Sequence, residues 1–270
     1  MPEIRRRRKL VVITRFVGLL LVAGLTVGIF FALEIGGGRR LPRRDARELF
    51  DEAEAWRAHG AAATETLDAL RVKYEKVIQA APESSSAQKA LLRLAEVERS
   101  VGDSARALAH LQRLVNGYPE SSLAAQARYM TGRIWQKDVG DGERALASYQ
   151  VVVNTYLPAF NGPGREVPEA VKRLTVSPML RTVVLNALIG SATIEAEKGD
   201  FGAAVETIAK AREKFPDDPA AEELMMWEAD LRADRCGDLP GARKLWSDLL
   251  LNRQGSPWSA VAERRLESVR

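Results

Sequence analysis

The chain has 270 residues, of which 46% are hydrophobic and 28% charged, and this suits one or two ordinary domains that bury a core. The net charge of +4 is unevenly placed: residues 1–47 carry eleven Arg/Lys against three Asp/Glu, whereas the remainder carries 29 basic and 33 acidic residues. A nucleic-acid-binding protein needs its basic patch on the folded part, so this distribution argues against that class.

The N-terminal region contains a long apolar run. Phe16 to Leu33 is uncharged over eighteen residues, which as a helix spans about 27 Å, close to the roughly 30 Å hydrocarbon thickness of a bilayer. The alternative, a cleavable signal peptide, has a shorter apolar region and a small-residue cleavage site, and the segment around Ile35 is a poor match. We therefore expect a basic tail at 1–9, a transmembrane helix at 10–33 and a linker at 34–45.

Basic residues flank both ends of this expected helix in nearly equal numbers. The compact cluster from Arg5 to Lys9 comes first, and it favours an N-terminus inside the cytoplasm with the large domain outside. The expected location is the inner (cytoplasmic) membrane, crossed once, with a periplasmic or otherwise extracytoplasmic domain.

One phrase recurs four times along the remaining chain. GDSARAL, GDGERAL, GDFGAAV and GDLPGAR begin at Gly102, Gly140, Gly199 and Gly237, with separations of 38, 59 and 38 residues. A proline recurs nearly in step, at Pro82, Pro119, Pro158 and Pro216. A fixed period with one excess indicates a repeat array with an insertion, which we place at about 158–178.

Each unit has the pattern of two helices joined by a turn. Glycine suits the end of the first helix, aspartate caps the second, and proline ends it. The second helix carries Ala at the sixth place of the phrase and bulky apolar residues further on, as in Ala107, Leu111 and Leu114. The first helix carries a mostly small residue eight positions before the Gly: Leu94, Gly132, Ser191 and Ala229. Small residues facing large ones predict units that stack into an α-solenoid.

The recurring order of a small residue, Gly-Asp-x-x-x-Ala, a bulky residue and Tyr/Phe-Pro resembles tetratricopeptide repeats over about residues 46–268. Tyr-Pro-Glu-Ser-Ser at 118–122 and the closing SPWSAVAERRLESV resemble the bacterial envelope subclass, which includes the outer-membrane assembly lipoprotein and the Tol-Pal coordinator. This sequence lacks the lipid-attachment cysteine of the former. The expected fold is all-α: a single N-terminal transmembrane helix, then a tetratricopeptide-like α-solenoid of about five helix pairs at 46–270, closed by a cap helix at 257–268.

Residues with catalytic or metal-binding potential are sparse. His59 and His110 have no companions at metal-ligand spacing, and phosphate-loop, Gly-x-Ser-x-Gly and HExxH motifs do not occur in the sequence. We therefore predict no enzyme, cofactor or metal. Cys236, the single cysteine, is predicted to be a buried structural thiol.

The resemblance implies a protein partner on a concave face lined by the first helices. The outward positions expected there are Gln88, Glu98, Gln126, Arg133, Gln136, Lys137, Glu195, Glu223, Asp230 and Asp234. Phe160 and Arg165 of the insertion are expected to be exposed anchors, since aromatic and arginine side chains often dominate interface energy. An ordinary solvated helix face is the alternative interpretation of these charges.

The function expected from this pattern is that of a membrane-anchored repeat scaffold or adaptor. It would mediate protein–protein interaction in a bacterial cell envelope, for example in envelope or outer-membrane assembly. The alternative is an accessory periplasmic chaperone associated with protein translocation, which would hold many unrelated clients.

Overall fold

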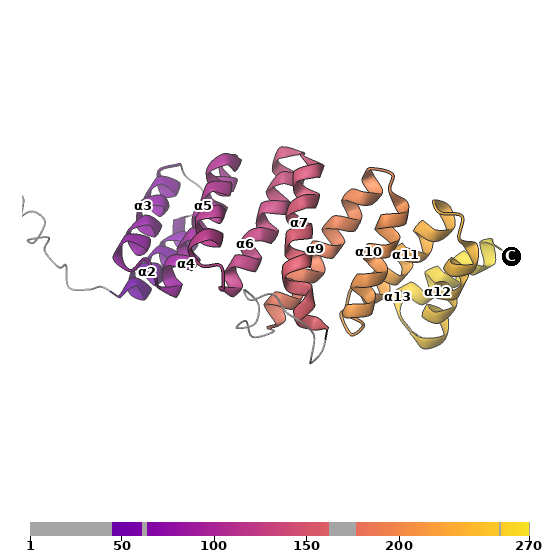
Figure 1. Ribbon diagram of the computed structural model, residues 1–270. Coiled ribbons are helices and arrows are strands. Elements are labelled where there is room, and N and C mark those ends of the chain that lie inside the picture. Colours follow the sequence, from indigo (N-terminus) through magenta and orange to yellow (C-terminus); the bar gives the residue numbers. More distant parts are fainter. Residues whose placement is uncertain (1–44, 61–63, 162–176, 254, 270) are drawn as a thin grey trace, which may run out of the picture. The chain divides into compact units, whose positions relative to one another are not determined.

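The computed structural model describes residues 45–60, 64–161, 177–253 and 255–269, and the regular structure in this part of the chain is entirely helical. Within these ranges eleven α-helices follow one another, ten of them in consecutive pairs (Figure 1). The pairs are α2 (Ala46–Gly60) with α3 (Thr64–Ala80), α4 (Ser85–Ser100) with α5 (Ser104–Gly117), α6 (Ser122–Arg133) with α7 (Gly142–Tyr156), α9 (Pro178–Glu197) with α10 (Phe201–Lys214), and α11 (Ala221–Asp234) with α12 (Leu239–Asn252). The final helix is α13 (Pro257–Ser268). The predicted all-α arrangement of about five pairs and a last helix is confirmed for these residues.

Neighbouring pairs are joined by packing between helices that follow each other in the chain. The second helix of each pair contacts the first helix of the next, so that α3 packs on α4, α5 on α6, α7 on α9, α10 on α11 and α12 on α13. First helices also contact one another, as α2 does α4, α4 does α6, and α6 does α9. Each pair therefore buries its apolar faces against its neighbours, as expected of a solenoid (Figure 1).

The Gly-Asp phrase forms the turn between the two helices of four pairs. The four glycines have φ of 80° at Gly102, 78° at Gly140, 83° at Gly199 and 69° at Gly237. This left-handed conformation is favourable for glycine because it has no Cβ. Each aspartate is the N-cap of the following helix and accepts the backbone N–H three residues on: Asp103 from Arg106, Asp141 from Arg144, Asp200 from Ala203 and Asp238 from Gly241. The predicted roles of both residues are confirmed.

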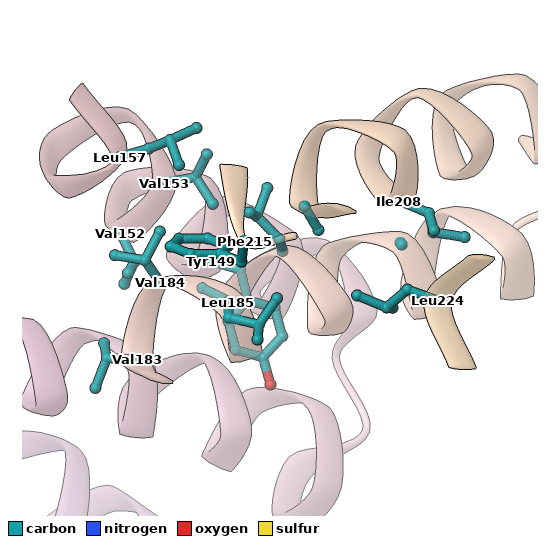
Figure 2. Packing of buried hydrophobic residues seen from close by; sticks show 14 of the residues in the cluster. Tyr149, Val152, Val153, Leu157, Val183, Val184, Leu185, Ile208, Phe215 and Leu224 are labelled. Atoms are coloured by element: carbon teal, nitrogen blue, oxygen red, sulfur yellow. The ribbon is translucent and has the colours of Figure 1, made fainter. Parts of the chain in front are cut away.

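The core follows the periodic positions of the second helices. The alanine of the phrase is fully buried in all four pairs, at Ala107, Ala145, Ala204 and Ala242. The bulky residue four positions later is at most 1% exposed: Leu111, Tyr149, Ile208 and Trp246. Burying such a side chain contributes about 1.5–3 kcal/mol relative to leaving it in water. Figure 2 shows the central cluster, in which Tyr149, Ile208 and Phe215 pack among aliphatic side chains of α7, α9 and α11.

The first helices differ in register by one residue, which the sequence pattern does not reveal. In two turns the backbone N–H of the aspartate donates to the carbonyl five residues earlier, and in the other two to the carbonyl six residues earlier. The bonds are Asp103 to Glu98, Asp200 to Glu195, Asp141 to Trp135 and Asp238 to Arg232. The extra residue of the third pair lies in a π-helical turn, η1 (Ile134–Val139), which continues α6. The equivalent small residues are therefore Ala95, Gly132, Ala192 and Ala229, all buried, and the prediction of Leu94 and Ser191 at this place was wrong.

The structure bears on only some of the predictions made for the N-terminal segments, the insertion and Cys236. The basic tail at 1–9, the transmembrane helix at 10–33 and the linker at 34–45 lie outside the described residues, apart from Asp45 at the end of the linker. Before the insertion, a 3-10 turn, η2 (Leu157–Phe160), follows α7 directly, and α9 begins at Pro178. Cys236 is exposed, so the predicted buried thiol was wrong.

One helix of the described part, α9, is long and apolar enough to cross a membrane by length and composition. Its apolar residues form part of the central core, since Leu180, Val184 and Leu188 are at most 2% exposed. The composition of α9 is therefore explained by its position in the middle of the stack, where it contacts α6, α7 and α10.

Candidate protein-interaction face

The solvent-facing residues of α2, α4, α6 with η1, α9 and α11 form what we call the first-helix face. Most of the residues that the sequence suggests for partner binding lie on these helices. Arg133 and Lys137, one turn apart where α6 continues into η1, are both exposed. Within the described part of the chain neither forms a salt bridge, although the charge of Arg133 contributes, after that of Arg99, to lowering the pKa of Asp138. Gln126, earlier on α6, is half-buried.

The centre of the face is built around Tyr149, a residue of a second helix. Its ring lies between two backbone segments without side chains: a Cβ placed on Gly132 or on Gly190 would come within 2.6 Å of ring carbons. This close approach lets the hydroxyl reach the first helices, where it donates to Gln136 Oε1 at 3.0 Å. Tyr129 lies beside it with ring centroids 5.8 Å apart. Burial, with a smaller effect from Tyr129, raises the pKa of Tyr149, so the hydroxyl is a neutral donor.

Two of the three acids predicted at the C-terminal end of the face, Asp230 and Asp234, pair with the last helix, whereas Glu223 is exposed. Arg265 of α13 donates from Nε to Asp230 Oδ1 at 2.9 Å and also contacts the carboxylate of Asp234. Asp230 therefore contributes to attaching α13 to α11, and its charge is largely balanced within the chain. The sequence gives no signal for this pairing because the two partners are 35 residues apart.

Two residues predicted to be exposed are less exposed than expected: Glu98 is buried and Phe160 is half-buried. Glu98 is 2% exposed, and Arg71 of α3 donates to both of its carboxylate oxygens at 2.8 Å, so the outward position expected for it was wrong. Phe160 is half-buried in η2 and packs edge-on against Phe215, with ring centroids 5.2 Å apart, so it is not an exposed anchor. Arg165 lies outside the described residues.

Ion pairs also connect neighbouring first helices. Arg93 of α4 donates to Glu54 of α2 at 3.1 Å, and Arg99 of α4 donates to Asp138 of η1 at 2.5 Å. The hydrogen bond from Arg99 lowers the pKa of the Asp138 carboxyl. Many charges on the face thus hold one pair against the next, which leaves fewer free groups for a partner than the sequence suggests.

Two polar groups of α9, from Ser191 and Glu195, differ from these paired charges. Only Glu195 was among the binding residues predicted from the sequence. Ser191 is 3% exposed, and one turn later Glu195 Oε2 is enclosed. Neither the Ser191 hydroxyl nor Glu195 Oε2 has a hydrogen-bond partner among the described residues. Glu195 as a whole is half-buried. Buried polar groups are normally satisfied, so this pair requires an explanation.

Groups suited to catalysis or metal binding are few in the part of the chain that is described. Clusters of three or more His, Cys, Asp or Glu that could hold a metal ion do not occur there. The Nδ1 of His110 is buried without a partner, and burial, aided by the nearby charge of Arg113, lowers its pKa. The arrangement offers hydrogen bonds and charge for binding a protein segment.

Comparison with known proteins identifies one of the helix pairs. Residues 89–121 match the family model described as Tetratricopeptide repeat. This segment includes most of α4 and all of α5, together with the Gly102-Asp103 turn. The same turn, cap and buried alanine recur in three more pairs, which supports a tetratricopeptide-repeat protein. The predicted envelope subclass is not tested by this match.

Several solved structures resemble the chain at low sequence identity. The crystal structure of MamA is 18% identical with a TM-score of 0.48, covering 73% of this chain and 92% of that one. YrrB, a TPR protein with an unusual peptide-binding site, is 14% identical with a TM-score of 0.47, covering 87% and 97%. TTC0263, a thermophilic TPR protein of Thermus thermophilus, is 16% identical with a TM-score of 0.37, covering 83% and 98%. No curated protein sequence matches the chain.

Proposed function

We propose that the chain is a membrane-anchored repeat scaffold that binds a protein partner on its first-helix face in a bacterial cell envelope. The observation that carries this proposal is the pair of exposed cations at the centre of that face, Arg133 and Lys137, which form no salt bridge with any residue that the structure describes. Most other charged groups named above on the face are used within the stack, as Asp138 and Asp230 are. Free charge at the middle of an extended surface suits a partner that lies across several pairs.

The membrane location is supported by the sequence. The uncharged run from Phe16 to Leu33 has the length of a bilayer-spanning helix, and the arginine cluster before it favours an N-terminus inside the cytoplasm. A reporter enzyme that is active only in the cytoplasm, fused after Arg270, should be inactive while the chain fractionates with membranes. High reporter activity would reverse the proposed topology, and recovery in the aqueous fraction would contradict the anchor.

Partner binding can be tested by crosslinking in cells followed by capture of the full chain. Arg133→Glu with Lys137→Glu reverses the charge at the centre of the face, and we expect recovery of one stoichiometric partner to fall about tenfold or more. The control is Lys76→Glu with Lys210→Glu, which makes the same change of charge at exposed positions of the second helices α3 and α10. Equal recovery from both double variants would contradict binding on the first-helix face. Capture of many unrelated proteins would favour the chaperone alternative.

A further inference from the structure

A glutamate occupies the same place in two first helices with different surroundings: Glu98 is buried, whereas Glu195 is half-buried with its Oε2 enclosed. The backbone carbonyls of Glu98 in α4 and Glu195 in α9 each accept the backbone N–H of the aspartate five residues later, at 2.9 Å. The two glutamates are therefore at equivalent positions of their repeats. Glu98 is neutralised by Arg71 from the preceding second helix, whose guanidinium contacts both carboxylate oxygens. In the second helix pair, the carboxylate at this position is thus paired with a planar guanidinium from the first pair.

Among the described residues, no cation forms a salt bridge with Glu195 of α9 as Arg71 does with Glu98. Arg71 stands three residues before the buried Tyr74 of α3, and the residue three positions before the buried Tyr149 of α7 is Leu146. Leucine cannot donate a hydrogen bond, and Glu195 Oε2 has no hydrogen-bond partner in the part of the chain that the structure describes. The nearest cation along α9, Lys198, pairs with Glu143 at 3.5 Å. Within the described residues, Glu195 therefore lacks a counterpart of Arg71.

A second unpartnered group lies on the same side of α9. Ser191 precedes Glu195 by four residues, so the two side chains are neighbours on one helix face. The Ser191 hydroxyl is buried and unbonded, although it can accept a hydrogen bond as well as donate one. A carboxylate next to a hydroxyl acceptor suits a group with several N–H donors and a positive charge.

We propose that Glu195 and Ser191 form the recognition site for a basic side chain of the protein partner, arginine above all. The partner's guanidinium would supply from outside the cation that Arg71 supplies within the chain at Glu98. Arginine is favoured over lysine because its planar fork donates two parallel hydrogen bonds to a carboxylate. This inference rests on the proposed function, and it adds the chemistry of the partner segment at the fourth pair.

The test uses the full chain in detergent and a displayed library of random peptides as the probe. Peptides selected on the unchanged protein should carry arginine at a common position. Their affinity should fall roughly tenfold on Glu195→Gln, which removes the charge while retaining size. Leu146→Arg should remove the arginine preference as well, because the new side chain can pair with Glu195 as Arg71 does with Glu98. Glu206→Gln, which neutralises an exposed acid of the second helix α10, outside the first-helix face, is the matched control and should change nothing.

The outcomes separate this inference from the proposed function. Selected peptides without a basic position, or an arginine preference that survives both Glu195→Gln and Leu146→Arg, would overturn the inference while leaving the scaffold role intact. If Leu146→Arg fails to fold, the comparison of Glu195→Gln with Glu206→Gln still decides it. Failure to select any peptide, together with failure of the cellular capture, would overturn both.

Discussion

At the scale of single residues, the Tyr149 ring is tightly packed between two glycines, Gly132 and Gly190. Replacing Gly132 or Gly190 by alanine would place a Cβ 2.6 Å from its ring carbons, so the ring or a helix must move. We expect each substitution to destabilise the protein by about 1–3 kcal/mol, the usual cost of overpacking a core. Urea unfolding followed by circular dichroism measures this loss.

Gly202 provides the matched control for that prediction. It also lies inside a helix, α10, but an added Cβ would have its nearest neighbour, Asp200 Oδ1, at 3.9 Å. Gly202→Ala should therefore leave stability unchanged or raise it by up to about 1 kcal/mol, since alanine is the better helix former. Equal destabilisation at Gly202 and Gly132 would contradict the assigned position of Tyr149.

The Arg99–Asp138 pair predicts a dependence on pH. The hydrogen bond from Arg99 lowers the pKa of Asp138 in the folded state. A lowered pKa stabilises the fold at pH values above the unfolded pKa, and this contribution is lost as the pH falls through the folded value. Both side chains are partly exposed, so Asp138→Asn should cost no more than about 1 kcal/mol at neutral pH.

Thermal unfolding at a series of pH values tests this. The difference in Tm between the unchanged protein and Asp138→Asn should begin to shrink below about pH 4, the ordinary pKa of aspartate in the unfolded chain. It should disappear once the pH is below the lowered pKa of the folded state. A difference that persists unchanged at lower pH would show that the substitution acts through packing.

The periodic residues were predictable from the sequence, whereas their polar contacts were not. Ala107 and its three equivalents are buried as expected because each repeats a local pattern of one helix. Glu98 and Asp230 were expected at the surface, but their partners Arg71 and Arg265 come from other helices, 27 and 35 residues away. A pattern within one helix carries no information about which charge a neighbouring helix presents.

At the scale of elements, helix ends were predictable because glycine, aspartate and proline act locally. The π-helical turn η1 was not, since an extra residue in a helix leaves the Gly-Asp phrase unchanged and shifts only the residues before it. The insertion was predicted as an interruption of the period, and its first residues continue directly from α7 as η2.

The packing of η2 indicates that Phe160 stabilises the fold, whereas the sequence suggested an exposed anchor for a partner. Phe160 is half-buried against Phe215, which is 1% exposed and belongs to the turn after α10. We expect Phe160→Ala to lower stability by about 1–3 kcal/mol through lost burial and ring contact. Partner recovery should stay unchanged at a temperature where the variant is folded. A stable variant that loses its partner would restore Phe160 as a binding residue.

At the scale of the whole molecule, the described helices between residues 46 and 269 form one stack in which each pair covers its neighbours. Such an array presents a long face built from successive first helices, and partner binding is proposed to take place there. The second helices carry exposed cations too, as at Lys76 and Lys210, so the proposal depends on which face the partner touches.

Photocrosslinking in cells tests this proposal most directly. A photoreactive amino acid is placed in the full chain at Arg133 or Lys137 of the first-helix face, and in separate variants at Lys76 or Lys210 of the second helices. Binding on the first-helix face predicts an adduct of one mass from both first-helix positions and none from the second-helix positions. Adducts from Lys76 and Lys210 alone, or a spread of masses from all four positions, would contradict it.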